Sequence, residues 1–409
     1  MRVLWFEVTT PSAYDIGGTP LGGWQDSLER IVRTIPEIEL SVAFMSDKDI
    51  EVREIDGVKY MPISCTMTIW ERLFYPRWDI FVKKLIAAAK TIIDQSNPDL
   101  IHIFGTEWPF GQVATITNVP VIIHIQGAIV PYNNALLPPG YSFFEEFLRK
   151  IFSPLQLLKF LLEYRDNKNR EVWERKTWSL VSNYMGRTCW DHALANVLHP
   201  QCLYFHVEEA LRASFTDSSK KWNCRDSGKI QLLSTGCGDY RKGPDMLIKT
   251  AKILTGLKVS FEWIVAGGMP VSLIKDVERK SGCTFSECNV RFIGFANTDK
   301  LKDLLCSSTI YVHTAYMENS PNSICEAQIL GVPVVSTNVG GIASLIRDGV
   351  DGILVPANDP WFMAYSIVRL INDKSLMLKM SHNSSSFAKE RHDDNNIKKQ
   401  LLAAYKSIV

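Results

Sequence analysis

Short apolar runs of strand length alternate with helical segments along most of this chain, and no other feature limits its fold as strongly. Segments between the runs, such as 25–35 and 246–254, place apolar residues on one face at helical spacing. Strands that alternate with helices form parallel sheets covered on both faces. We therefore predict an α/β fold. The apolar runs lie at 3–6, 40–44, 100–104, 119–125, 230–233, 261–265, 290–293, 310–312 and 332–335.

The alternation forms two series, which predict two domains. A chain of 409 residues exceeds the usual size of a single hydrophobic core. The polar stretch 216–229, TDSSKKWNCRDSGK, has few apolar residues to bury and is typical of a linker. We place one domain at residues 1–215 and the second at 216–380. Residues 381–409 are expected to form a helical tail that packs back on the N-terminal domain.

Charge and cysteine content exclude several classes of function. The 45 basic and 44 acidic residues leave a net charge of +1, which argues against a broad cationic face for nucleic acid. The nine cysteines include no C-x-x-C pair, so reduced thiols and a cytoplasmic location are expected. The N-terminal residues MRVLWFE are typical of a core strand rather than a signal peptide. No apolar run is long enough to predict a membrane-spanning helix.

Glycines follow the first predicted strand of each domain. Gly22 and Gly23 precede a helix near Trp24, in a segment that fits neither G-x-G-x-x-G nor a P-loop. Because ligands bind beyond the carboxyl ends of parallel strands, we interpret this segment as a ligand-contacting loop, with a plain glycine turn as the alternative. In the second domain, Gly236 follows the strand, and Arg241 and Lys242 precede a helix. Cations beside a helix N-terminus predict a binding site for an anion. The alternative is that Arg241 and Lys242 are exposed to solvent and bind no ligand.

Two glutamates, Glu318 and Glu326, flank a predicted helix start within MENSPNSICEAQILGVPVVSTNVGG. Ser320 suits an N-cap and Pro321 the first helical position. Free amides at this start could bind a phosphate, while Glu326 on the second turn accepts hydrogen bonds from a vicinal diol. Glu318 then faces whatever lies beyond the phosphate. Solvated surface glutamates are the alternative. The candidate donor-binding residues of this segment are Asn319, Ser320, Asn322, Ser323 and Glu326.

This segment resembles the retaining glycosyltransferases of family 4, which have two facing Rossmann-like domains in the arrangement called GT-B. Glu318 and Glu326 match the family's E-x7-E motif, residues 331–335 its G-x-P-V-V strand, and Gly340-Gly341 its following GG. The segments STGCGDYRKGPDMLI, WIVAGG and DGVDGILVPANDP fit other elements of the same domain. In the first domain the resemblance is limited to Gly22-Gly23 and IIHIQG.

The resemblance implies a metal-independent, retaining enzyme of hexosyltransferase type in surface polysaccharide biosynthesis. It would move a sugar from a nucleotide-diphosphate sugar, bound by the C-terminal domain, to a glycan or lipid-linked saccharide bound by the N-terminal domain. No cofactor is expected, and we interpret D-x-D at 47–49 as a polar turn.

By position, the resemblance implies that Glu326 holds the ribose and Glu318 faces the donor sugar. Lys242 would neutralise the diphosphate, and His124 would lie near the anomeric carbon. Glu318, His124 and Lys242 are therefore the candidate catalytic residues. Cys237 stands where the family usually has arginine, and Arg241 is the candidate substitute.

Several alternatives remain open from the sequence. A sugar-nucleotide epimerase of the same fold and an inactive nucleotide-binding partner subunit are the competing functions. Arg187 is a candidate for contact with the donor phosphates or for an interdomain salt bridge. His102, in mid-strand, is expected to have a structural role. The apolar segment 141–170, which includes Arg149, Lys150 and Lys159, is expected either to form two core helices or to contact a membrane surface peripherally.

Overall fold

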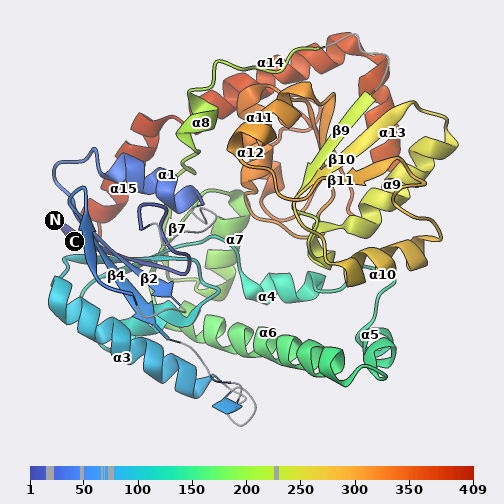
Figure 1. The fold of residues 1–409 in the computed structure, drawn as a ribbon. Helices are drawn as coiled ribbons and strands as arrows, with labels where there is room; N and C mark the ends of the chain where they lie inside the picture. Colours follow the sequence, from blue (N-terminus) through green and yellow to red (C-terminus); the bar gives the residue numbers. More distant parts are fainter. Residues whose placement is uncertain (15–22, 47–49, 66–67, 69, 72–77, 225–229) are drawn as a thin grey trace. The chain divides into compact units, whose positions relative to one another are not determined.

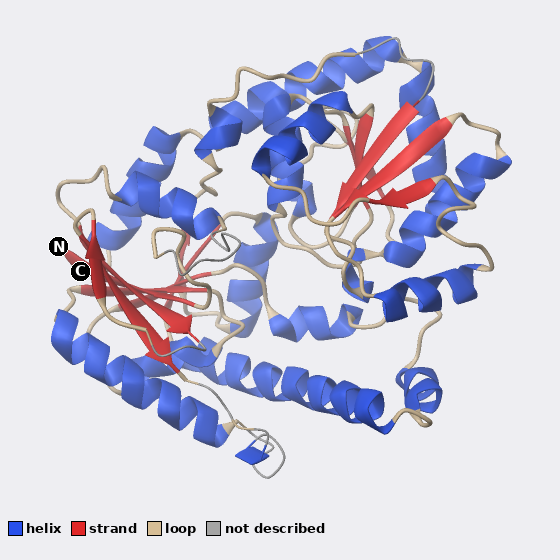
Figure 2. Cartoon of the chain, in the orientation of Figure 1, coloured by secondary structure: helices blue, strands red, loops and turns tan. Residues whose placement is uncertain are grey.

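The computed structural model describes residues 1–14, 23–46, 50–65, 68, 70–71, 78–224 and 230–409 (Figure 1). The chain forms two compact units, each described by itself below. The N-terminal unit comprises Met1–Asn134, Ser142–Ala210 and Asp393–Val409, and the C-terminal unit comprises Ala135–Tyr141 and Leu211–His392. Each unit is built on a sheet flanked by helices (Figure 2).

The sheet of the N-terminal unit has the strand order β3-β4-β2-β1-β5-β6-β7-β8. All neighbouring pairs are parallel except β3 and β4, which form an antiparallel edge. The strands are β1 (Arg2–Glu7), β2 (Glu39–Ser46), β3 (Arg53–Ile55), β4 (Val58–Ser64), β5 (Leu100–Phe104), β6 (Val121–His124), β7 (Asn183–Gly186) and β8 (Leu203–His206). The helices are α1 (Trp24–Val32), α3 (Asp79–Ser96), α4 (Ile129–Tyr132), α5 (Phe143–Lys150), α6 (Pro154–Leu180), α7 (Cys189–Leu198) and α15 (Asp394–Lys406).

Helices cover both faces of this sheet, because its central strands are apolar on both sides. In β1, Leu4 and Phe6 join one core cluster, whereas Val3 and Trp5 join the other, as the alternation of side chains along a strand requires. The second cluster also receives α1 and the C-terminal helix α15, which lie side by side in Figure 1. Trp5 Nε1 donates a hydrogen bond to the Tyr405 hydroxyl at 3.1 Å, which ties α15 to the first strand.

The sheet of the C-terminal unit is parallel throughout, in the order β11-β10-β9-β12-β13-β14. Its strands are β9 (Ile230–Thr235), β10 (Phe261–Ala266), β11 (Val290–Phe292), β12 (Ile310–His313), β13 (Val334–Thr337) and β14 (Ile353–Val355). Its helices are α8 (Ala213–Thr216), α9 (Pro244–Gly256), α10 (Val271–Ser281), α11 (Thr298–Ser307), α12 (Asn322–Leu330), α13 (Pro360–Asn372) and α14 (Lys374–Arg391). The α/β class predicted from the alternation is thus confirmed.

The unit boundaries lie close to the predicted domain boundaries but do not coincide with them. The C-terminal unit begins at Leu211 rather than at residue 216, because Leu211 and Phe215 are buried in its core. Residues 381–391 stay in the same unit, since α14 contributes Met380 and Ala388 to that core. Only from Asp393 onward does the tail belong to the N-terminal unit. No helix in the described residues is long and apolar enough to cross a membrane.

Candidate functional site

The loop after β9 brings two cations to the start of α9. Asp239 caps the short helix η3 (Tyr240–Lys242) by accepting a hydrogen bond from the Lys242 amide at 3.1 Å. Gly243 follows with φ +69°, and a Cβ there would lie 1.9 Å from the Thr314 carbonyl oxygen. Only glycine fits this approach. The Thr314 hydroxyl donates to the Lys242 carbonyl at 2.9 Å, so the loop is fixed against the end of β12.

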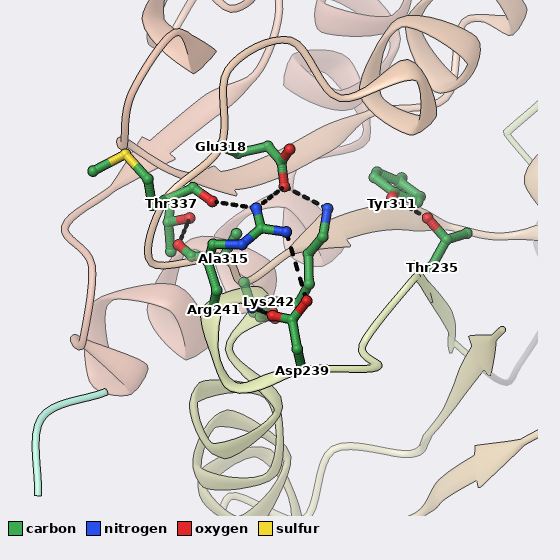
Figure 3. Close-up of polar contacts among 10 residues, drawn as sticks. Thr235, Asp239, Arg241, Lys242, Tyr311, Ala315, Glu318 and Thr337 are labelled. Carbon is green, nitrogen blue, oxygen red and sulfur yellow. Dashed lines mark hydrogen bonds and ion pairs between the residues drawn. The ribbon is translucent and has the colours of Figure 1, made fainter. Parts of the chain in front are cut away.

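Glu318 lies in the loop after β12 and faces both cations (Figure 3). Its Oε2 accepts a hydrogen bond from Lys242 Nζ and lies 3.4 Å from Arg241 Nη1. Arg241 Nη1 also donates to the Met317 carbonyl at 3.1 Å, and its Nη2 lies 3.5 Å from Asp239 Oδ2. The Glu318 side chain is only 12% exposed. Sequence positions 76 residues apart therefore meet in a protected ion-pair network.

The network keeps Glu318 ionised. Burial alone would raise the pKa of Glu318, but the charges of Lys242 and Arg241 outweigh burial and hold that pKa below its ordinary value. His313, the last residue of β12, lies in the same field. Burial, with the charge of Lys242, lowers the pKa of His313 to about 4, so its imidazole is neutral. Among the described residues its Nε2 has no hydrogen-bond partner.

The Gly-Gly turn after β13 is built against the backbone of Glu318. Gly340 has φ +53°, and a Cβ at this position would lie 1.9 Å from the Glu318 carbonyl oxygen. The Gly341 amide donates to that same oxygen at 3.0 Å. The turn is therefore packed against the Glu318 backbone, which gives a physical reason for the Gly340-Gly341 pair of the motif.

Glu326 lies on α12, which starts at Asn322 with Pro321 as its N-cap, one residue later than predicted. Gly331, at φ +84°, ends the helix where expected. Glu326 is 3% exposed, so the alternative that both glutamates are solvated is wrong. Its Oε1 accepts hydrogen bonds from Arg212 Nε at 2.9 Å and Arg212 Nη2 at 2.5 Å.

The remaining candidates of this unit lie around the same carboxyl ends. Asn319 and Ser320 are buried, whereas Asn322 and Ser323 are half-buried at the start of α12. Gly236 directly follows β9 with φ +70°. Cys237 is buried, and burial raises the pKa of its thiol to about 12, so it supplies no charge. The Oγ1 of Thr235, the last residue of β9, lies 2.8 Å from the hydroxyl of Tyr311 on β12 (Figure 3).

Sequence reasoning missed Arg212 and His313. His313 carries a usable signal, since it ends an apolar strand as His124 does. Arg212 carries none, because 114 residues separate it from Glu326.

The N-terminal candidates lie inside their own unit. His124 ends β6 and is fully buried, with its ring 4.6 Å from the Trp24 ring and stacked at 5.5 Å on His102. Neither ring nitrogen has a hydrogen-bond partner among the described residues, and burial holds the pKa of His124 well below its ordinary value. Its place near an anomeric carbon stays a prediction. The structural role of His102 is confirmed, because its Nδ1 lies 2.5 Å from the Tyr405 hydroxyl.

Arg187 is also buried. Its Nε lies 3.3 Å from Glu209 Oε2, and its guanidinium lies 4.6 Å from the centre of the Trp24 ring. Arg187 and Glu209 belong to the same unit, so this salt bridge is not interdomain. Gly23 forms the N-cap of α1, while Gly22 and the D-x-D at 47–49 lie outside the described residues. Within the described ranges, no group of three or more His, Cys, Asp or Glu side chains is placed to hold a metal ion.

Residues 230–373 match the family described as Glycosyl transferases group 1. An uncharacterized glycosyltransferase of Methanocaldococcus jannaschii is 29% identical over 194 residues, which cover 46% of this chain and 48% of the relative. A D-inositol 3-phosphate glycosyltransferase of Acidothermus cellulolyticus is 28% identical over 172 residues, or 40% of this chain and 38% of the relative. The match thus spans less than half the length of either relative.

Solved structures resemble the whole chain. Sucrose-phosphate synthase from Thermosynechococcus elongatus has a TM-score of 0.73 at 17% identity, covering 99% of this chain and 98% of its own. Anabaena HepE in complex with UDP-glucose has a TM-score of 0.64 at 16% identity with full coverage of both chains. WaaG, a glycosyltransferase involved in lipopolysaccharide biosynthesis, has the same score, identity and coverage. Residues 230–373 of the C-terminal unit are therefore similar to the glycosyl transferases group 1 family, and the chain has the GT-B fold.

Proposed function

We propose that this protein is a retaining glycosyltransferase that moves a sugar from a nucleotide-diphosphate sugar to a glycan or lipid-linked saccharide. The observation that carries the proposal is the half-buried ion-pair network of Lys242, Arg241 and Glu318 beside the start of α9. Free helix amides and two cations form an anion site at the edge of the sheet where ligands of parallel α/β folds bind. The binding of UDP-glucose by HepE supports a nucleotide-sugar as the ligand.

Lys242 and Arg241 are the proposed diphosphate ligands. Breakage of the sugar–phosphate bond leaves negative charge on the departing diphosphate, and a preorganised donor in a protected site can stabilise such charge by about 3–4 kcal/mol. The neutral thiol of Cys237 cannot do this, whereas Arg241 lies beside Lys242 and shares its carboxylate partner. This arrangement supports Arg241 as the second cation.

Glu318 and Glu326 divide the remaining polar groups of the donor. Glu318, kept ionised by the cations, would face the sugar and its developing positive charge. Glu326 would accept hydrogen bonds from the ribose hydroxyls, and the α12 amides near Asn322 and Ser323 would meet a phosphate oxygen. The leaving phosphate itself would take the acceptor's proton on the same face, so the mechanism requires neither a general base nor a metal ion.

The N-terminal unit is the proposed acceptor domain, and α5 with the start of α6 its membrane contact. The other expectation for this segment, two core helices, is wrong where α5 leads into α6, because Phe152 is 95% and Leu155 83% exposed. Apolar side chains with nearby basic residues are typical of peripheral binding to anionic lipid. The exposed apolar residues include Phe144, Leu148, Ile151, Phe152, Leu155 and Leu158, and the basic ones are Arg149, Lys150 and Lys159.

A cytoplasmic enzyme at the inner membrane face could then extend a lipid-linked saccharide. The role of WaaG in lipopolysaccharide biosynthesis supports surface polysaccharide biosynthesis as the pathway class.

A thermal-shift screen against a panel of nucleotide-sugars tests the donor assignment. A ligand present at 100 times its dissociation constant adds about 2.7 kcal/mol to the free energy of unfolding. Donor turnover is then measured with and without saccharide acceptors, which separates a transferase from an epimerase and from an inactive subunit. Proton NMR of the product should show the donor's anomeric configuration. Inversion at that carbon would contradict the retaining mechanism.

A further inference from the structure

The carboxylate of Glu326 is paired with a cation that is distant in the sequence, Arg212. Both Arg212 hydrogen bonds converge on its Oε1, at 2.9 and 2.5 Å. Glu326 is 3% exposed, and a carboxylate so buried is stable as an ion only when it is paired and hydrogen-bonded. Arg212 therefore contributes directly to the orientation of the Glu326 side chain.

Arg212 is itself held in place before any ligand arrives. Its Nη1 donates to Thr298 Oγ1 at 3.0 Å, and its guanidinium lies 4.7 Å from the centre of the Phe215 ring. Phe215 is fully buried in the core of the C-terminal unit. A planar guanidinium fixed by stacking and by a third hydrogen bond loses little freedom when it binds a carboxylate.

The position of Arg212 in the chain is also informative. The chain passes from the N-terminal to the C-terminal unit between Ala210 and Leu211, and Arg212 is the next residue. The same segment is held on α12 without the ion pair, because the Trp222 amide donates to the Leu330 carbonyl at 2.8 Å. Loss of the Arg212 side chain should therefore leave the segment folded against α12.

We propose that Arg212, near the start of the C-terminal unit's main segment, is a positioning residue for donor binding that orients the Glu326 carboxylate toward the ribose hydroxyls. The proposal rests on the proposed function, in which Glu326 holds the ribose. It predicts that the contribution of the ribose hydroxyls to affinity is lost when Arg212 is replaced, even though Glu326 is still present.

Calorimetric titration of the full chain tests this with UDP, GDP and ADP, followed by the 2′,3′-dideoxy form of the tightest binder. The unaltered protein should prefer the ribose form at least tenfold. Arg212→Gln and Glu326→Gln should each reduce that preference to about twofold or less and leave the affinity for the dideoxy form unchanged. The double variant should lose nothing further. Arg212→Lys keeps the positive charge but lacks the planar guanidinium with its paired N–H donors, so it should retain an intermediate preference for the ribose form.

Arg291→Gln is the matched control, because Arg291, on the edge strand β11, forms a more exposed arginine–carboxylate pair at 2.9 Å with Glu262 on β10. This variant should keep the full preference. If Glu326→Gln loses the preference and Arg212→Gln keeps it, the role of Arg212 is refuted while the ribose assignment stands. If both keep it, or no nucleotide binds, the ribose assignment fails as well. Should Arg212→Gln not fold, an unchanged preference in Arg212→Lys refutes the proposal.

Discussion

Gly340→Ala should reduce turnover by displacing Glu318, although residue 340 is not expected to touch the substrate. A Cβ on Gly340 would lie 1.9 Å from the Glu318 carbonyl oxygen, and contacts below 3.0 Å essentially never occur. The backbone of Glu318 or of the turn must therefore move by at least 3.0 − 1.9 = 1.1 Å. A displacement of about 1 Å at a reacting centre can cost about 10²-fold in rate.

The same substitution also costs stability, and a control separates the two effects. Gly340 has φ +53°, where a side chain costs about 1–2 kcal/mol. Gly349 has φ +72°, and a Cβ there meets no heavy atom within 4 Å. Gly349→Ala should therefore share the conformational cost without the collision. We expect both variants to unfold at lower urea concentration, and only Gly340→Ala to lose turnover by about two orders of magnitude.

The assay is release of nucleoside diphosphate from the donor that the thermal-shift panel identifies, with urea unfolding followed in parallel. Turnover should be measured at a temperature where both variants are fully folded. A folded Gly340→Ala protein with turnover within about threefold of the unaltered protein would refute the reasoning, because the turn would then not set the position of Glu318.

Three further outcomes follow from other parts of the chain. Lys242→Met should lower turnover at least about tenfold. Lys242 also helps to hold the pKa of Glu318 below 4.5. The variant's loss in free energy of unfolding, measured in urea, should therefore be largest above pH 4.5 and shrink as the pH falls below that value. Burial raises the pKa of Glu174 from 4.5 to about 7, so the folded protein holds a proton that the unfolded chain releases, and stability should fall on the order of 3 kcal/mol as pH rises across that window. Glu174→Gln should flatten this slope, and an unchanged slope would exclude Glu174 as its source. Phe152→Asp should weaken sedimentation with anionic vesicles several-fold, whereas Val197→Asp, at a site 76% exposed on α7, should not; equal losses would contradict a localised membrane contact.

The sequence alone determined the features that depend on local order. Alternating apolar runs and helical segments predicted the parallel α/β sheets, since side-chain periodicity is a property of each element by itself. Capping chemistry at 320–321 and glycine at 331 located α12 to within one residue, because helix ends are set by nearby side chains. The E-x7-E spacing drew attention to Glu318 and Glu326, which the structure places at 12% and 3% exposure, and their roles toward a donor stay a prediction.

The tertiary structure decided which distant side chains meet. Nothing in the sequence pairs Arg212 with Glu326 or Trp5 with Tyr405, which are 114 and 400 residues apart. The tertiary structure also gives different surroundings to two histidines that end apolar strands in the same way. His124 is surrounded by aromatic rings, whereas His313 lies close enough to Lys242 and Glu318 to be affected by their charges. Periodicity records which face of an element is buried, but the charges and rings packed against that face belong to other parts of the chain, and only folding brings them together.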